Sequence, residues 1–165
     1  MNTEPPPRVS RANELVVLLA ALSTAAAMIH AVVTPKHFEE SAYLGTFFTV
    51  AAAAQLGWAV WILVRPKEKW LYILGAVGNL AIACLWVLSR TAGVPIGPDA
   101  WTPEAVHAID LLATLQEVAI ASISCLIIAR WTPPRVLRLK AIRAGTWHLV
   151  LVVIGGTAWQ LVLHH

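Results

Sequence analysis

Residues 102–129 read TPEAVHAIDLLATLQEVAIASISCLIIA, and they decide the fold. From Leu111 to Ala129 the run is apolar and long enough to cross a bilayer as one helix. Polar side chains recur through this stretch at about 100° per residue, so that one helix face would carry His107, Asp110, Thr114 and Glu117. A charge at membrane depth usually faces a protein interior or a wet cavity. This face is therefore the main candidate for a functional site, and contacts that only join neighbouring helices are the alternative.

The whole chain shares this apolar character. Of its 165 residues, 58% are hydrophobic and 13% are charged, and the mean hydropathy is +0.69. These values exclude an ordinary soluble domain and predict an all-α membrane protein, with one membrane domain, residues 14–164, after a polar tail, residues 1–13. Apolar runs predict a bundle of five transmembrane helices, at about 14–33, 43–64, 70–88, 104–129 and 145–163.

Thr-Pro pairs predict where three helices begin, because Thr caps a helix and Pro fits its first turn. The pair at 34–35 predicts that the second helix begins there, and the pair at 102–103 predicts the start of the fourth. The pair at 132–133 leads into a basic, amphipathic segment, residues 133–143. We expect this segment to lie along the membrane surface, where its charges can meet anionic headgroups.

Basic residues predict the orientation. With the amino terminus in the cytoplasm, all 12 Lys and Arg residues except Lys36 and Arg90 lie on the cytoplasmic side. The carboxyl terminus is then extracytoplasmic, and the protein lies in a cell membrane, either a plasma membrane or a bacterial inner membrane. Because the positive charge follows membrane sidedness, the net charge of +3 predicts a lipid bilayer as partner and no nucleic acid.

Histidine and carboxylate side chains gather on the extracytoplasmic side in this orientation. Imidazole and carboxylate groups suit zinc, copper or another divalent transition metal. The leading functional hypothesis is therefore a metal ion or metal cofactor bound by His30, His37, Glu40, His107 and Asp110. A haem variant would use His30 and His107 as axial ligands. These residues follow no fixed-spacing motif, and histidines near a membrane interface also serve as plain hydrogen-bonding groups.

Proton-coupled transport of a small solute or an ion is the second hypothesis. It uses Asp110 and Glu117 as proton carriers, together with the amides of Gln55 and Asn79 on two other helices. These groups would form a funnel open to the outside, with Glu117 about 10 Å below Asp110. The alternative for Glu117 is a neutral acid that hydrogen-bonds to Gln55 or Asn79.

A structural role is the third hypothesis. Small residues in several predicted helices allow close helix packing, as in an accessory subunit of a larger membrane complex or in a homo-oligomer. The sequence contains no nucleotide-binding loop, no Cys-x-x-Cys pair and no Gly-x-Ser-x-Gly turn. It therefore assigns no enzyme class.

Arg90 lies in the stretch LWVLSRTAGVPIGP, residues 85–98. We expect it to pair with Glu104 or Asp110, and an alternative is that it extends to lipid headgroups. Together with three polar residues ahead of the second span, this stretch resembles a pattern in multi-span integral membrane proteins of bacteria, chiefly actinobacteria, which share a Ser-Arg-Thr-x-Gly-x-Pro-x-Gly-Pro loop; the three residues are His30, His37 and Glu40. The resemblance implies a membrane protein and no particular activity.

Overall fold

A computed structural model describes residues 11–96, 99–131 and 144–163, and all regular structure in these ranges is helical. The helices are α1 (Arg11–Glu40), α2 (Ala42–Val64), α3 (Lys69–Thr91), α4 (Ala108–Ala129) and α5 (Ala144–Leu163). In this part of the chain, five helices are long and apolar enough to span a membrane, which confirms the predicted multi-span helical protein. The amino-terminal ten residues and the basic segment 133–143 lie outside the described residues.

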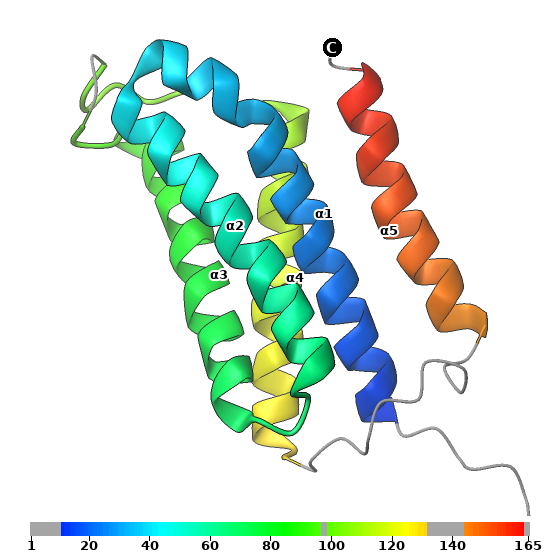
Figure 1. The fold of residues 1–165 in the computed structure, drawn as a ribbon. Coiled ribbons are helices and arrows are strands. Elements are labelled where there is room, and N and C mark those ends of the chain that lie inside the picture. Colours follow the sequence, from blue (N-terminus) through cyan, green and yellow to red (C-terminus); the bar gives the residue numbers. More distant parts are fainter. Residues whose placement is uncertain (1–10, 97–98, 132–143, 164–165) are drawn as a thin grey trace, which may run out of the picture.

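α1 is the central helix of the bundle, between α2 and α5 and against α4 (Figure 1). Its alanines, among them Ala20, Ala25 and Ala26, are buried and let the neighbouring helices approach closely. Many large apolar side chains of the other helices point outward, as expected of a surface that faces lipid; examples are Val50, Leu56, Val60, Leu80 and Val152. We call the end of the bundle with Glu40 and residues 92–107 the loop end, and the end where residues 65–68 join α2 to α3 the turn end.

The prediction that a helix begins at Thr34-Pro35 is wrong, because α1 runs through Pro35 to Glu40. The Thr34 hydroxyl does not cap a new helix but donates to the carbonyl of His30, one turn back in the same helix (2.7 Å). Pro35 lacks the backbone N–H that would continue the ladder, and α1 bends in its last turns (Figure 1). α2 begins instead after Ser41, whose side chain accepts a hydrogen bond from the Tyr43 N–H.

The prediction that α4 begins at Thr102-Pro103 is also wrong, since residues 102–107 are extended and the helix starts at Ala108. This segment is tied to the end of α3, because the backbone N–H of Glu104 donates to the carbonyl of Ser89 (3.0 Å). Gly93, at a φ of 76°, lets the loop pass against the backbone of residues 101–102, where a Cβ would collide. His107 therefore precedes α4. Of the four residues predicted to share one helix face, the other three, Asp110, Thr114 and Glu117, lie on the α4 face that lines a pocket.

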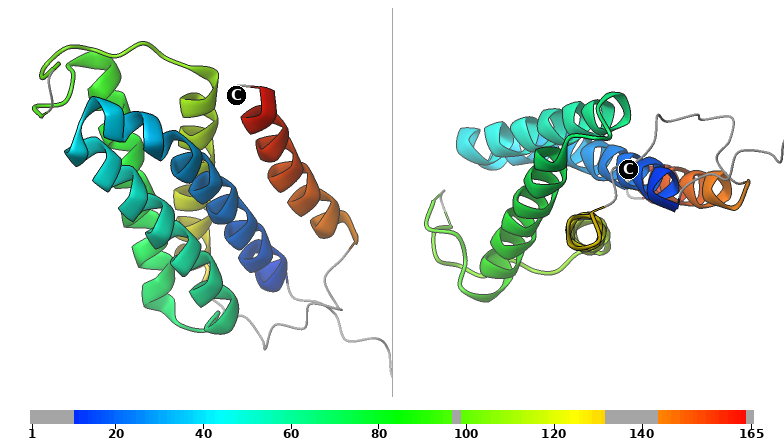
Figure 2. Two further views of the ribbon diagram at one scale, coloured as in Figure 1. Left: turned by 45° about the horizontal axis from the view of Figure 1, so that its top comes forward. Right: turned by 90° about the horizontal axis from the view of Figure 1, so that it is seen from below.

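α2 and α3 are held together near the turn end and separate toward the loop end. The Trp58 indole donates to the carbonyl of Leu71 (2.9 Å) and lies where a Cβ on Gly75 would be. Deeper in the bundle, the Gln55 amide donates to the Asn79 side chain (3.3 Å). Beyond this contact the two helices diverge, as the view from below shows (Figure 2, right). Their divergence leaves room between them for a pocket at the loop end.

Candidate functional site

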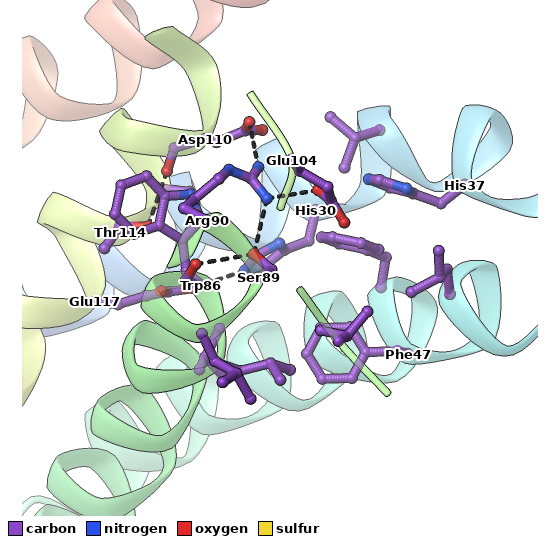
Figure 3. A pocket seen from close by; sticks show the side chains of 18 of the residues that line it. His30, His37, Phe47, Trp86, Ser89, Arg90, Glu104, Asp110, Thr114 and Glu117 are labelled. Carbon is purple, nitrogen blue, oxygen red and sulfur yellow. Dashed lines mark hydrogen bonds and ion pairs between the residues drawn. The ribbon is translucent and has the colours of Figure 1, made fainter. Parts of the chain in front are cut away.

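A pocket of about 380 Å³ lies at the loop end, enclosed by α1, α2, α3, α4 and the loop after α3 (Figure 3). Most of its wall is apolar, including Leu44, Phe47 and Phe48 of α2 and Ile82, Leu85 and Leu88 of α3. Its polar lining residues are His30, His37, Ser89, Arg90, Glu104, Asp110, Thr114 and Glu117. An apolar cavity with a few convergent polar groups has the composition expected of a small-molecule site.

The most deeply buried polar contact of the pocket joins α1 to α4. His30 Nε2 lies 2.9 Å from Glu117 Oε1, and the two side chains are 5% and 1% exposed. Nδ1 of His30 has no hydrogen-bond partner among the described residues. At this distance one hydrogen bond joins the imidazole nitrogen to the carboxyl oxygen, with the proton supplied by the ring N–H or by a carboxylic acid. The pair therefore places two buried, hydrogen-bonded ionisable groups beside the pocket.

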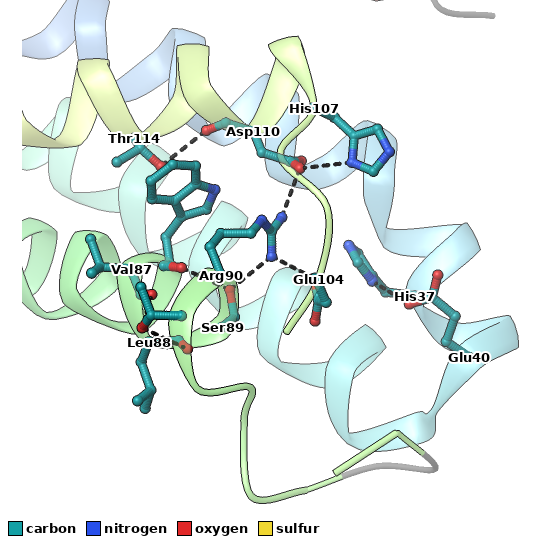
Figure 4. Close-up of polar contacts among 12 residues, drawn as sticks. His37, Glu40, Val87, Leu88, Ser89, Arg90, Glu104, His107, Asp110 and Thr114 are labelled. Carbon is teal, nitrogen blue, oxygen red and sulfur yellow. Dashed lines mark hydrogen bonds and ion pairs between the residues drawn. The ribbon is translucent and has the colours of Figure 1, made fainter. Parts of the chain in front are cut away.

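Arg90 of α3 organises the pocket rim (Figure 4). Its guanidinium donates through Nη1 to Glu104 and to the Ser89 hydroxyl, and through Nη2 to Asp110 (2.7 Å). The group also lies over the indole of Trp86, 5.6 Å from the ring centroid. Arg90 thus contacts both of the carboxylates that the sequence offered as partners, and it ties the extended segment and the start of α4 to the end of α3.

The residues expected to form a metal site are distributed over three separate pairs. His30 contacts Glu117, His37 contacts Glu40 (2.9 Å), and His107 contacts Asp110 (3.4 Å). The ring of Phe48 stacks on His37 (centroids 4.0 Å apart) and lies 5.5 Å from His30. Within the described ranges, no three His, Cys, Asp or Glu side chains are grouped so that they could hold a metal ion. The zinc, copper and haem hypotheses stay predictions without a converging ligand set.

His107 lies farthest from the expected arrangement. Its side chain is 66% exposed and it is not a lining residue of the pocket, because it sits on the outer side of Asp110 (Figure 4). His30, in contrast, is buried and lines the pocket. The structure therefore does not bring the two proposed axial haem ligands together across the cavity.

The predicted polar pathway also divides. The Gln55 side-chain amide donates to the Asn79 side-chain oxygen, and the Asn79 amide donates to the backbone carbonyl of Gly75 (2.9 Å). The Ser23 hydroxyl donates to the backbone carbonyl of Gln55 (2.8 Å). None of these residues lines the pocket. In the part of the chain that the structure describes, Glu117 pairs with His30 and not with either amide. The two side-chain amides join α2 to α3 away from the pocket, whereas Asp110 and Glu117 line it.

The His30–Glu117 pair is the feature that the sequence analysis missed. It placed His30 in a metal site near the surface and Glu117 in a deeper pathway. The pocket walls were missed as well, because Phe47, Phe48 and Trp86 are indistinguishable in sequence from packing residues. A signal was present in the polar pattern, since His30 and Glu117 are the ionisable groups farthest inside their helices.

Comparison with protein-family models, with curated proteins and with solved structures finds no match to this chain. The pocket and its residues are therefore the observations from which a function can be inferred.

Proposed function

We propose that this multi-pass membrane protein binds a small amphipathic solute in the loop-end pocket and couples its transport to proton exchange. The observation that carries the proposal is the buried His30–Glu117 pair beside a largely apolar cavity of about 380 Å³. An ionisable pair at membrane depth is costly to bury and contributes little net stability, so it is a candidate for a functional pathway. The apolar walls supply affinity for the solute, and the pair supplies the proton.

The orientation of the chain follows from its basic residues. The positive-inside rule places the turn end, with Arg65, Lys67 and Lys69, in the cytoplasm. The loop end and the carboxyl terminus are then extracytoplasmic, and the pocket receives its solute from outside a plasma membrane or bacterial inner membrane. Asp110 takes a different part from the one first expected. Its carboxylate is engaged by Arg90, so the His30–Glu117 pair carries the proton.

The contacts of the polar groups favour transport over metal binding and over a purely structural role. A metal ion would have to draw ligands from three pairs that are already satisfied separately. A purely structural subunit has no use for a cavity beside a buried ionisable pair. The pocket and the pair together support a solute site.

Purified protein in liposomes that contain a pH-sensitive dye provides the test. Three probes of similar size and different charge are added outside: benzyltrimethylammonium, phenylmethanesulfonate and benzyl alcohol. The two ions carry no exchangeable proton, so neither moves protons across the bilayer by itself. We expect a protein-dependent pH change with at least one probe, lost in Glu117→Gln.

The matched control is Glu14→Gln, the same change at a buried carboxyl group of α1 near the turn end. It should retain the pH response. The absence of any protein-dependent pH change with all three probes, in folded protein, would overturn the proposed function.

A further inference from the structure

The charges around the pocket are unequal in number. Its charged and titratable lining groups are His30 and His37 from α1, Arg90 from α3, Glu104 from the extended segment, and Asp110 and Glu117 from α4, while α2 contributes only apolar side chains. Three carboxyl groups thus face one guanidinium and two imidazoles, and the imidazole of His37 already contacts Glu40. This excess of carboxyl groups favours a positively charged guest, which would offset their negative charge.

Arg90 does not offset this balance in favour of an anion. Nη1 is engaged by Glu104 and Ser89 and Nη2 by Asp110, and the buried Nε has no partner among the described residues. An anionic headgroup at Arg90 would therefore lie against two carboxylates, and like charges at that distance repel strongly where water is scarce. Arg90 therefore serves to hold the rim together through its carboxylate partners, and the carboxyl groups that line the pocket determine the sign of its electrostatic potential.

The walls suit an organic cation. Phe47 and Phe48 meet edge to face in the α2 wall, with ring centroids 5.3 Å apart, and Phe47 lies toward the cavity (Figure 3). Aromatic faces attract ammonium groups, and the attraction is strongest where the cation is desolvated. A cavity of about 380 Å³ takes a guest with one ring or a short chain.

We propose that the solute is a small lipophilic organic cation, taken up in exchange for a proton of the His30–Glu117 pair. This inference rests on the proposed function and names its substrate class. With two protons on its ring nitrogens and carboxyl group together the pair is neutral overall, and it becomes singly negative when one of these protons leaves. One monovalent cation then replaces that proton, so charge in the pocket is conserved. The proton departs from Nδ1 of His30, the ring position without a partner among the described residues.

Binding in lipid nanodiscs, measured by calorimetry with the same three probes, tests the substrate class. We expect benzyltrimethylammonium to bind and to release about one proton per cation into a weakly buffered solution. Phenylmethanesulfonate and benzyl alcohol should release none. Empty nanodiscs measure partition of the probes into lipid.

Two exposed or wall positions give tests that do not disturb the buried pair. Glu104→Gln removes one rim carboxylate and should weaken the cation by about threefold, whereas an anion would bind more tightly. Phe47→Ala should weaken the cation by about fivefold, and Phe47→Tyr, which keeps an aromatic face, should restore most of the affinity. Melting temperatures near that of the parent protein would show that each variant is folded.

The outcomes separate the two proposals. Proton exchange driven by phenylmethanesulfonate or benzyl alcohol, or tighter binding in Glu104→Gln, would overturn the cation assignment and leave proton-coupled transport standing. Silence with all three probes would overturn both.

Discussion

Two pairs of buried polar side chains join helices in this bundle, and they differ in charge and in whether a cavity lies beside them. Near the middle of their helices, the buried side chains of Gln55 and Asn79 join α2 to α3 through a hydrogen bond. Toward the loop end, His30 and Glu117 join α1 to α4 beside a cavity. Neutral amides cost little to bury once they are paired, whereas an ionisable pair is expensive. This difference in cost is why the proposed function is assigned to the loop-end pair.

Removal of one member of the loop-end pair should give the largest effect. Glu117→Ala leaves His30 without its partner, and we expect the free energy of unfolding to fall by about 3–5 kcal/mol, measured by denaturation in detergent. The double variant His30→Leu with Glu117→Leu should recover most of that loss, because two apolar residues of similar size need no desolvation of charge. It should nevertheless show no proton exchange.

The comparison would fail if Glu117→Ala cost no more than Asn79→Ala. Both groups would then be simple contacts between helices. A double variant as unstable as the single one would show that the pair is needed for the fold.

The sequence predicted the helices better than their ends. Five apolar runs sufficed to predict five spanning helices, since length and hydropathy are local properties. The ends at Thr34-Pro35 and Thr102-Pro103 were misplaced because tertiary contacts decided them. α1 tolerates Pro35 near its end, and the backbone of Glu104 bonds to α3 in place of starting a helix.

These two errors also concealed the site. A first span ending at Val33 put His30 close to the surface, and a fourth span starting at Glu104 put Glu117 well below it. In the structure α1 ends at Glu40 and α4 begins at Ala108, so both side chains lie at one depth and meet. The polar groups could be read from the sequence, and their partners depended on helix ends that it did not determine.

Substitution of Gly75 tests how much the contact between α2 and α3 near the turn end contributes to stability. A Cβ on Gly75 would lie 2.4 Å from the Trp58 ring, so Gly75→Ala forces the indole to move and strains its bond to Leu71. We expect a loss of about 1–3 kcal/mol in the free energy of unfolding. Gly78→Ala is the matched control, since nothing lies within 4 Å of a Cβ there. Proton exchange should be unchanged in both variants, and its loss in Gly75→Ala would show that the two ends of the bundle are coupled.

Loss of the hydrogen bond between Gln55 and Asn79 should destabilise the protein less than Glu117→Ala or Gly75→Ala. Asn79→Leu leaves the Gln55 amide without its acceptor, and hydrogen bonds between membrane helices contribute about 0.6 kcal/mol on average and up to about 1.7. We expect a loss within that range, measured by the same denaturation, and a normal pH response in liposomes. A variant that is stable but inactive would return Asn79 to the proton pathway.

The smallest effect should come from α5, which packs on α1 and whose polar link to α4 is the bond from the Gln116 amide to the Thr157 hydroxyl (2.9 Å). Thr157→Val keeps the shape and removes the acceptor, so we expect a loss of about 0.5–1 kcal/mol. Thr157→Ser keeps the hydroxyl and should lie near the parent protein. Neither Gln116 nor Thr157 lines the pocket, and proton exchange should persist in each variant. If Thr157→Val abolished exchange without unfolding the protein, the transport unit would include α5, and the division between a packed region and a working loop end would have to be redrawn.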